Sequence, residues 1–412
     1  MRGILLPSLA AGLMLQAQPA AQRFTLPNGL QVVHLEDHER PVVRVRLHLR
    51  LEPSDTPPGR QGLSLLIMRM FAHSDAADLK PEVFDRLLED SGLQLDATSV
   101  PGGLEWSLVA RSRDQDRGLG LLADRLLRTI FDPTTLEVQR LACWRQEEGL
   151  DLPPYLLLQK MLMQDPDTRP SIASLGSITL DDLLIFRAKV FRPDRAVLVI
   201  HGDVGPEQAK RLVLLSLGTW TAQGLPQRPE TPSGGSLSTP SAIPRIQPRI
   251  LTSGTGFRIQ AVSPPPPDLQ PEAFNLLSLL IPGESALSPV SITIQPDGLV
   301  TTLDAATGTT WPEAWTMLQG RLAALRQRGF TQAELDQARN AWVAGRRLAS
   351  LNTEAKMTSV LIDALGRGTT PDRMRALTLD QLNAALRTWL DPKGMRSGTA
   401  GGAELLKTLP IP

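Results

Sequence analysis

Apolar residues along the chain follow the periods of both helices and strands. In the segment from Gln61 to Ser74, apolar side chains recur at i, i+3, i+4 and i+7, at Leu63, Leu66, Ile67 and Met70. This spacing predicts a helix with one face in a core. The segment 42–50 alternates instead, with an apolar set at Val43, Val45, Leu47 and Leu49. The alternation predicts a strand whose other face is basic, carrying Arg44, Arg46, His48 and Arg50.

Further strands and helices alternate along the first half of the chain. Two strands are expected within 23–50, with a turn at Asn28-Gly29. Other strands are predicted at 93–97, 104–110 and 196–204, and helices at 81–90, 117–130, 136–148 and 180–190. This mixed order predicts an α+β fold in which helices cover one face of a mostly antiparallel sheet.

The second half of the chain repeats the first weakly. The segment 131–142 (FDPTTLEVQRLA) matches 330–341 (FTQAELDQARNA), and 178–183 (ITLDDL) matches 377–382 (LTLDQL). Both pairs of segments lie 199 residues apart, as do Pro193 and Pro392. A shared offset predicts two tandem homologous domains.

The segment 224–248 is rich in Pro, Ser, Gly and Thr, which is typical of an exposed linker. The first residues have a different character: Arg2 is followed by an apolar run from Ile4 to Leu15 and by small residues up to Ala21. This pattern predicts a signal peptide rather than a membrane span. The expected organisation is a signal peptide at 1–21, a domain at 22–223, a linker at 224–248 and a domain at 249–412.

Composition narrows the class of protein. The chain has 412 residues, a net charge of zero and 42% hydrophobic residues, so it can bury two cores and has no basic excess that would suggest nucleic acid. Cys143 is its only cysteine, which excludes an intrachain disulfide. With the predicted signal peptide, these properties indicate an exported globular protein, periplasmic or secreted.

Four motifs resemble the M16 peptidases, the pitrilysin and mitochondrial-processing-peptidase group. They are Leu26-Pro27-Asn28-Gly29-Leu30, the helix that follows Gly62, the strand with Gly202-Asp203, and Gly329-Phe330-Thr331 before a helix. The resemblance covers roughly residues 23–400. It implies two M16-type domains with the LuxS/MPP-like metallohydrolase fold.

Active members of that family carry the inverted zinc motif His-x-x-Glu-His on this helix. In this sequence the three motif positions are Leu65, Met68 and Arg69, and the distant carboxylate position falls on Gln146, with Glu147 beside it. Leucine and methionine offer no nitrogen or oxygen ligand, and arginine stays cationic. The resemblance therefore implies a degenerate zinc site without catalytic residues or a bound metal.

Other residues do not supply a substitute site. The five histidines, His34, His38, His48, His73 and His201, are expected to be solvated or to cap helices. Cys143 lies in a predicted amphipathic helix and is expected in the core. The arginine and tyrosine with which the family grips substrate from its second domain also have no counterpart, because no Arg lies between Arg258 and Arg321 and the only tyrosine is Tyr155.

The favoured interpretation is a catalytically inactive M16-like subunit that pairs with an active zinc M16 protease and completes a peptide-degrading chamber. Zinc is then expected only in the partner subunit, and a bound peptide would add a strand to a sheet edge. No nucleic-acid partner and no membrane span are expected. Two alternatives stay open: a free-standing scaffold that binds peptides or proteins, and an active metallopeptidase with a rebuilt metal site.

Overall fold

The computed structural model describes residues 21–148, 153–163, 170–222, 249–252, 256–283, 290–295, 298–305, 308–366 and 368–402. The predicted linker and all of the predicted signal segment except Ala21 lie outside these ranges. Among the described residues, no helix has the length and apolar character needed to cross a bilayer.

The first half of the chain forms a six-stranded sheet in the order β1-β2-β8-β3-β6-β5. Its strands are β1 (Gln22–Thr25), β2 (Gln31–Glu36), β3 (Val42–Arg50), β5 (Gln94–Val100), β6 (Gly103–Arg111) and β8 (Ala196–Gly202). Two short strands, β4 (Asp75–Ala76) and β7 (Thr129–Ile130), pair separately. The sequence predicted two strands before residue 50; this was wrong, because the turn at Asn28-Gly29 closes an additional hairpin between β1 and β2.

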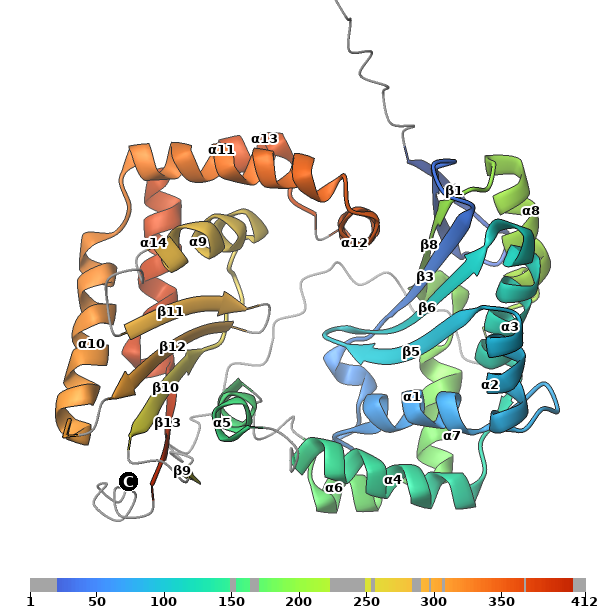
Figure 1. Ribbon diagram of the computed structural model, residues 1–412, viewed down its shortest axis with the longest axis horizontal. Coiled ribbons are helices and arrows are strands. Elements are labelled where there is room, and N and C mark those ends of the chain that lie inside the picture. Colours follow the sequence, from blue (N-terminus) through green and yellow to red (C-terminus); the bar gives the residue numbers. More distant parts are fainter. Residues whose placement is uncertain are drawn as a thin grey trace, which may run out of the picture.

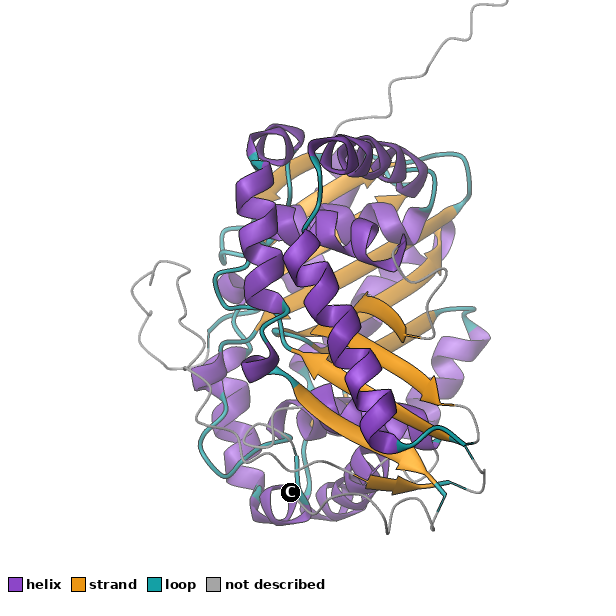
Figure 2. Ribbon diagram, turned by 90° about the vertical axis from the view of Figure 1, so that its left-hand side faces the viewer, coloured by secondary structure: helices purple, strands orange, loops and turns teal. Residues whose placement is uncertain are grey.

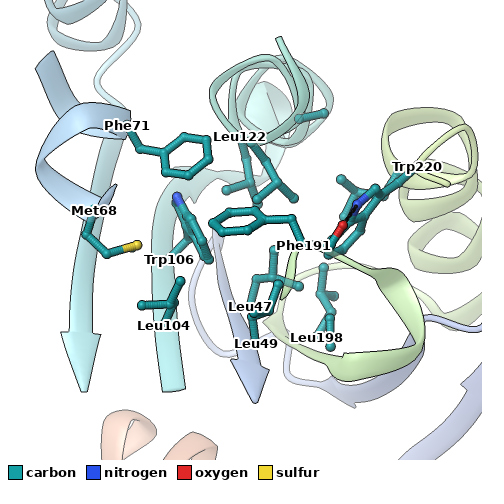
Figure 3. Packing of buried hydrophobic residues seen from close by; sticks show 14 of the residues in the cluster. Leu47, Leu49, Met68, Phe71, Leu104, Trp106, Leu122, Phe191, Leu198 and Trp220 are labelled. Atoms are coloured by element: carbon teal, nitrogen blue, oxygen red, sulfur yellow. Dashed lines mark hydrogen bonds between the residues drawn. The ribbon is translucent and has the colours of Figure 1, made fainter. Parts of the chain in front are cut away.

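Helices cover one face of this sheet. They include α1 (Leu63–His73), α2 (Pro81–Asp90), α3 (Gln115–Leu127), α7 (Leu180–Val190) and α8 (Pro206–Leu217), followed at the lower end by α4 (Pro133–Glu148) and α6 (Ile172–Ser177) (Figure 1). Beneath them, Phe71, Trp106 and Phe191 form the centre of the core, with ring centroids 4.8–5.6 Å apart (Figure 3).

The second half repeats this arrangement with five strands in the order β11-β12-β10-β13-β9. The strands are β9 (Arg249–Leu251), β10 (Phe257–Ser263), β11 (Val290–Gln295), β12 (Gly298–Ala305) and β13 (Arg396–Gly401). The helices are α9 (Pro271–Gly283), α10 (Trp311–Arg328), α11 (Gln332–Ala349), α13 (Pro371–Ala376) and α14 (Leu379–Trp389), and Figure 2 shows them in front of the sheet. In both sheets one neighbouring pair is parallel, β2 with β8 and β9 with β13, and the other pairs are antiparallel. The prediction of an α+β fold with two similar units is confirmed.

The two halves exchange a helix. The α5 helix (Pro154–Met163) packs Leu158 and Leu162 against the second sheet, whereas α12 (Thr353–Ala364) packs Met357 and Leu361 against the first. Both helices lie between the two sheets (Figure 1). Their first residues are 199 positions apart, so the exchange obeys the same offset as the sequence repeat.

The exchanged helices explain why β8 is apolar on both faces. Every residue from Ala196 to Gly202 is buried, because the outer helices cover one face and α12 covers the other. The predicted basic face of β3 also points to α12. There Arg46 donates to Thr358 Oγ1 at 2.7 Å, and Arg50 donates to the carbonyl oxygen of Ala364 at 3.3 Å. Polar and apolar contacts thus join the two halves.

Candidate functional site

The helix α1, which carries the degenerate motif, begins at a position that only glycine fits well. Gly62 has φ of 94°, in the left-handed region, and a Cβ there would lie 2.6 Å from Leu175 Cδ2. The close approach brings the start of α1 against α6. Local backbone geometry therefore fixes where α1 starts and which residues it turns toward the sheet.

Two of the motif positions belong to the hydrophobic core. Met68 is 2% exposed and points toward Leu104 and Trp106 (Figure 3). Leu65 is half-buried and packs against the same cluster. In a zinc protease the residue at position 68 would have to reach a metal-bound water, but here it fills the core.

The other two motif positions lie together at the contact between α1 and α4. Arg69 Nε donates to Gln139 Oε1 at 3.0 Å, and a terminal guanidinium nitrogen donates to Gln146 Oε1 at 3.4 Å. Gln139 is 7% exposed, whereas Gln146 is exposed. The structure thus brings Arg69 and Gln146 into contact. Gln139 was missed by the sequence analysis, although it shares a face of α4 with Gln146, two turns away.

The residues at this contact do not fit a zinc ion. Zinc requires imidazole, thiolate or carboxylate ligands, and the four motif positions offer an aliphatic group, a thioether, a cation and a neutral amide. Within the described ranges, no group of three or more His, Cys, Asp and Glu side chains is placed to hold a metal. The predicted alternative of a rebuilt metal site finds no geometric support in this part of the chain.

The histidines are largely buried, which corrects the expectation that all five are solvated or capping. His34, His48 and His201 are at most 4% exposed. His34 Nε2 lies 2.8 Å from the carbonyl oxygen of Val204. The sequence could not show this burial, because the face that holds His48 and His201 is covered by α12, which lies more than 150 residues further on in the chain.

Two histidines at the ends of β2 and β8 differ in their electrostatic surroundings. Hydrogen bonds to Asp203 (2.6 Å) and to Glu36 (3.0 Å) raise the pKa of the exposed His38. Burial lowers the pKa of His201, and the charge of Lys356 lowers it further, although Asp37 lies 3.3 Å away. His38 is therefore a cation more readily than His201.

Cys143 and Tyr155, the remaining candidate residues, both pack against other side chains of the fold. Cys143 is fully buried in the first core, as expected. Tyr155 lies on α5, and the guanidinium of Arg258 from the second half is 4.8 Å from its ring centroid. Arg258 also pairs with Asp304 at 2.7 Å. The chain's only tyrosine thus contacts an arginine of the other half, but this arginine is already held by a carboxylate.

One edge of the first sheet adjoins α1. The strand β5 is outermost in the sheet order, and no described strand pairs with its outer side. Ser99 on β5 donates to Ser64 Oγ on α1 at 3.4 Å. An extended peptide could add to this edge through backbone hydrogen bonds. The helix that carries the motif positions therefore lies beside an edge strand of the first sheet.

Known proteins share this fold. Residues 177–288 match the family described as Peptidase M16 inactive domain, whereas no curated protein matches the chain. The structure of a peptidase M16 inactive domain from Pseudomonas fluorescens superposes with a TM-score of 0.72 at 19% identity, covering 93% of this chain and 98% of that one. The structure of a protease from Helicobacter pylori superposes with a TM-score of 0.73 at 15% identity, covering 93% of this chain and 99% of that one.

A longer relative matches over one part only. The periplasmic protease PqqL from Escherichia coli superposes with a TM-score of 0.69 at 12% identity, covering 95% of this chain but 49% of PqqL. At these identities the likeness establishes the fold. Together with the family match, it confirms the resemblance stated from the sequence: the chain has the fold of M16-like peptidases, and its residues 177–288 match the family described as Peptidase M16 inactive domain.

Proposed function

We propose that this chain is a catalytically inactive M16-like subunit that pairs with an active zinc M16 protease. The proposal rests on where the structure places the side chains at the four motif positions. Met68 fills the core and Arg69 is bonded to two glutamine amides, so neither a base nor a ligand set is present at Leu65, Met68, Arg69 and Gln146. The cofactor of the assembly, zinc, would belong to the partner.

The likeness to PqqL supports the pairing. Nearly all of this chain corresponds to about half of that periplasmic protease, so a single PqqL chain is about twice as long as this one. If two such units are needed to enclose a peptide, this chain requires a second one. An active M16 protease of similar length would supply it, together with the catalytic residues. A peptide held between them would lie along β5 by strand addition.

The compartment is part of the same proposal. The predicted signal peptide at 1–21 and the likeness to PqqL, a periplasmic protease, both support export, to the periplasm or the exterior. The partner would then carry a signal peptide as well. Domain bounds at 22–223 and 249–412 follow from the repeat and from the linker composition of 224–248.

Two other functions remain as alternatives. A free-standing scaffold would use the same β5 edge without a protease. An active metallopeptidase would need metal ligands from outside the described residues. Metal analysis of the purified chain tests the second: we expect no stoichiometric zinc and no peptide cleavage by the chain alone. Near-stoichiometric zinc together with chelator-sensitive cleavage would overturn the proposal.

A mixing experiment distinguishes the subunit proposal from the free-standing scaffold. The chain is combined with the M16 protease encoded nearest to it, and the mass is measured by light scattering without peptide. A complex of one copy of each is expected, burying well over about 1,000 Å². If only separate chains or homodimers are found, the subunit proposal fails and the scaffold function replaces it.

A further inference from the structure

We propose that the contact between α12 and the first sheet is pH-sensitive and opens when the buried His201 takes up a proton. Opening would release the helix that the second half of the chain places on the first sheet, and would expose the side chains beneath it. The inference goes beyond the proposed function, because it requires neither a partner subunit nor a bound peptide. It describes how the two halves of one chain respond to the pH of their surroundings.

His201 lies on β8, on the face of the sheet that α12 covers. It is paired across the sheet with Arg44 of β3 and Leu35 of β2. Leu35 belongs to the apolar cluster that Met357 and Leu361 of α12 complete. The His201 side chain is buried, and neither of its ring nitrogens makes a hydrogen bond to a described residue. Such surroundings favour the neutral imidazole over the cation.

Four charged side chains from three segments act on the ring of His201. They are Asp37 after β2, Arg44 on β3, and Glu354 and Lys356 on α12. The Asp37 carboxylate lies 3.3 Å from His201 Nε2, and the Arg44 guanidinium lies 3.5 Å from Glu354. Two cations and two carboxylates sum to zero while the ring is neutral. A proton on His201 therefore gives this group a net positive charge at a buried position.

The closed contact binds the His201 proton weakly. Burial and then the charge of Lys356 lower the pKa of His201, and Arg44 adds to this effect, whereas Asp37 and Glu354 oppose it. When α12 leaves the sheet, Lys356 leaves with it and the ring meets water, so the pKa returns toward its ordinary value of about 6.5. The contact is then fully stable above pH 6.5 and weakens as pH falls toward the lowered value.

The duplicated contact in the other half has no histidine. The α5 helix covers the second sheet as α12 covers the first, and Leu162 of α5 is equivalent to Leu361 of α12, 199 residues later. Both leucines are buried, at 2% and 4% exposure. All five histidines of the chain precede residue 202, and none belongs to α5 or to a strand of the second sheet. The α5 contact is therefore a matched control within the same molecule.

The test measures how readily each contact opens, from the rate at which a buried cysteine reacts with 4,4′-dithiodipyridine. The reporters are Leu361→Cys, Met357→Cys and the control Leu162→Cys, each in the full chain with Cys143→Ser. Rates are measured from about pH 7.5 to about pH 5, where histidine titrates. Each rate is divided by that of the same chain unfolded in urea, which removes the pH dependence of the thiol itself. Circular dichroism at each pH verifies that the chain stays folded.

We expect the normalised rate at Leu361→Cys and at Met357→Cys to rise about threefold or more on acidification, because the open state takes up a proton. It should stay nearly constant at Leu162→Cys. Adding His201→Gln, which keeps a polar side chain that cannot be protonated, should remove the rise. Adding His38→Gln, which changes an exposed histidine outside the contact, should leave the rise unchanged.

The proposal is overturned if the rate rises at neither α12 reporter, if the rise survives His201→Gln, or if Leu162→Cys shows an equal rise. His48, another buried histidine on this face, lies 3.6 Å from the Glu105 carboxylate. Loss of the rise with His48→Gln but not with His201→Gln would also overturn the assignment. Because the chain is measured alone, failure here leaves the pairing with a protease untouched.

Discussion

The guanidinium of Arg46 lies 2.7 Å from the carboxylate of Glu354 and thereby joins the first sheet to the α12 helix of the second half. The same guanidinium lies 3.1 Å from Glu105 on β6. Arg46 and Glu105 are nearly buried, with side chains 15% and 17% exposed, whereas that of Glu354 is 57% exposed. The three charges should therefore contribute unequally to the contact between the halves.

We predict that Arg46→Met lowers the free energy of unfolding by about 2–4 kcal/mol, because it leaves the largely buried Glu105 carboxylate without its arginine and with only His48 Nδ1 nearby, at 3.6 Å. Glu354→Gln should cost less than about 1 kcal/mol, as is usual for an exposed ion pair. Urea unfolding of both variants provides the measurement. Equal losses for the two substitutions would contradict the difference in burial between Glu105 and Glu354.

The second prediction concerns Met68, which lies in the hydrophobic core. Met68→Glu should lower the free energy of unfolding by about 3 kcal/mol or more, because it places a carboxylate next to Leu104 and Trp106 in the core. Met68→Leu, its matched control, should cost less than about 1.5 kcal/mol. Leu65→Glu should fall between them, since Leu65 is half-buried. Thermal unfolding by circular dichroism ranks the three; an unchanged melting temperature for Met68→Glu would mean that α1 is misplaced.

Restoring the family motif should not restore a zinc site. The triple change Leu65→His, Met68→Glu, Arg69→His should bind zinc weakly at most, because the third ligand position is the neutral amide of Gln146. The quadruple variant that also carries Gln146→Glu should have a higher zinc affinity than the triple variant, since the new glutamate supplies the missing carboxylate. Isothermal titration with zinc, together with an unfolding curve for each variant, checks this. Tight binding by the triple variant would show that Gln146 is not the third position.

The histidines at the ends of β2 and β8 should titrate on opposite sides of 6.5, the ordinary pKa of histidine. Hydrogen bonds to Asp203 and Glu36 raise the pKa of His38, so its stabilisation is full below pH 6.5 and is lost as pH rises through the raised folded-state value. Burial lowers the pKa of His201, so its contribution is full above pH 6.5 and is lost as pH falls toward the lowered folded-state value. NMR titration of the imidazole signals, assigned with His38→Gln and His201→Gln, gives both values. The reverse order would refute this account of the two environments.

The repeat was visible in the sequence because it preserves interactions with buried backbone. Arg140 donates to the carbonyl oxygen of Ile178 at 2.6 Å, and Arg339, 199 residues later, donates in the same way to the carbonyl oxygen of Leu377. The helices that follow both carbonyls begin with a capping box, at Thr179 and at Thr378. Such contacts need particular residue types at fixed spacing, and this spacing predicted the second half from the first.

Contacts between distant segments were beyond sequence reasoning. The exchange of α5 and α12 depends on how two sheets face each other, and nothing in the local pattern of 154–163 indicates which sheet it covers. The same contact buries His48 and His201, which look like solvent-facing residues of half-buried strands. At the site, the placement of Arg69 beside Gln146 followed from the resemblance, but the Gln139 bond required knowledge of how α1 and α4 pack.

The rate of peptide cleavage by the neighbouring M16 protease, measured with and without this chain, tests the central claim most directly. The account predicts negligible cleavage by this chain alone and a higher rate when the two are mixed. The rise should persist with Cys143→Ser, because that residue is a buried part of the core. If the rate is unchanged on mixing, or if this chain alone cleaves the peptide in a chelator-sensitive reaction, it is not an inactive subunit of an M16 protease.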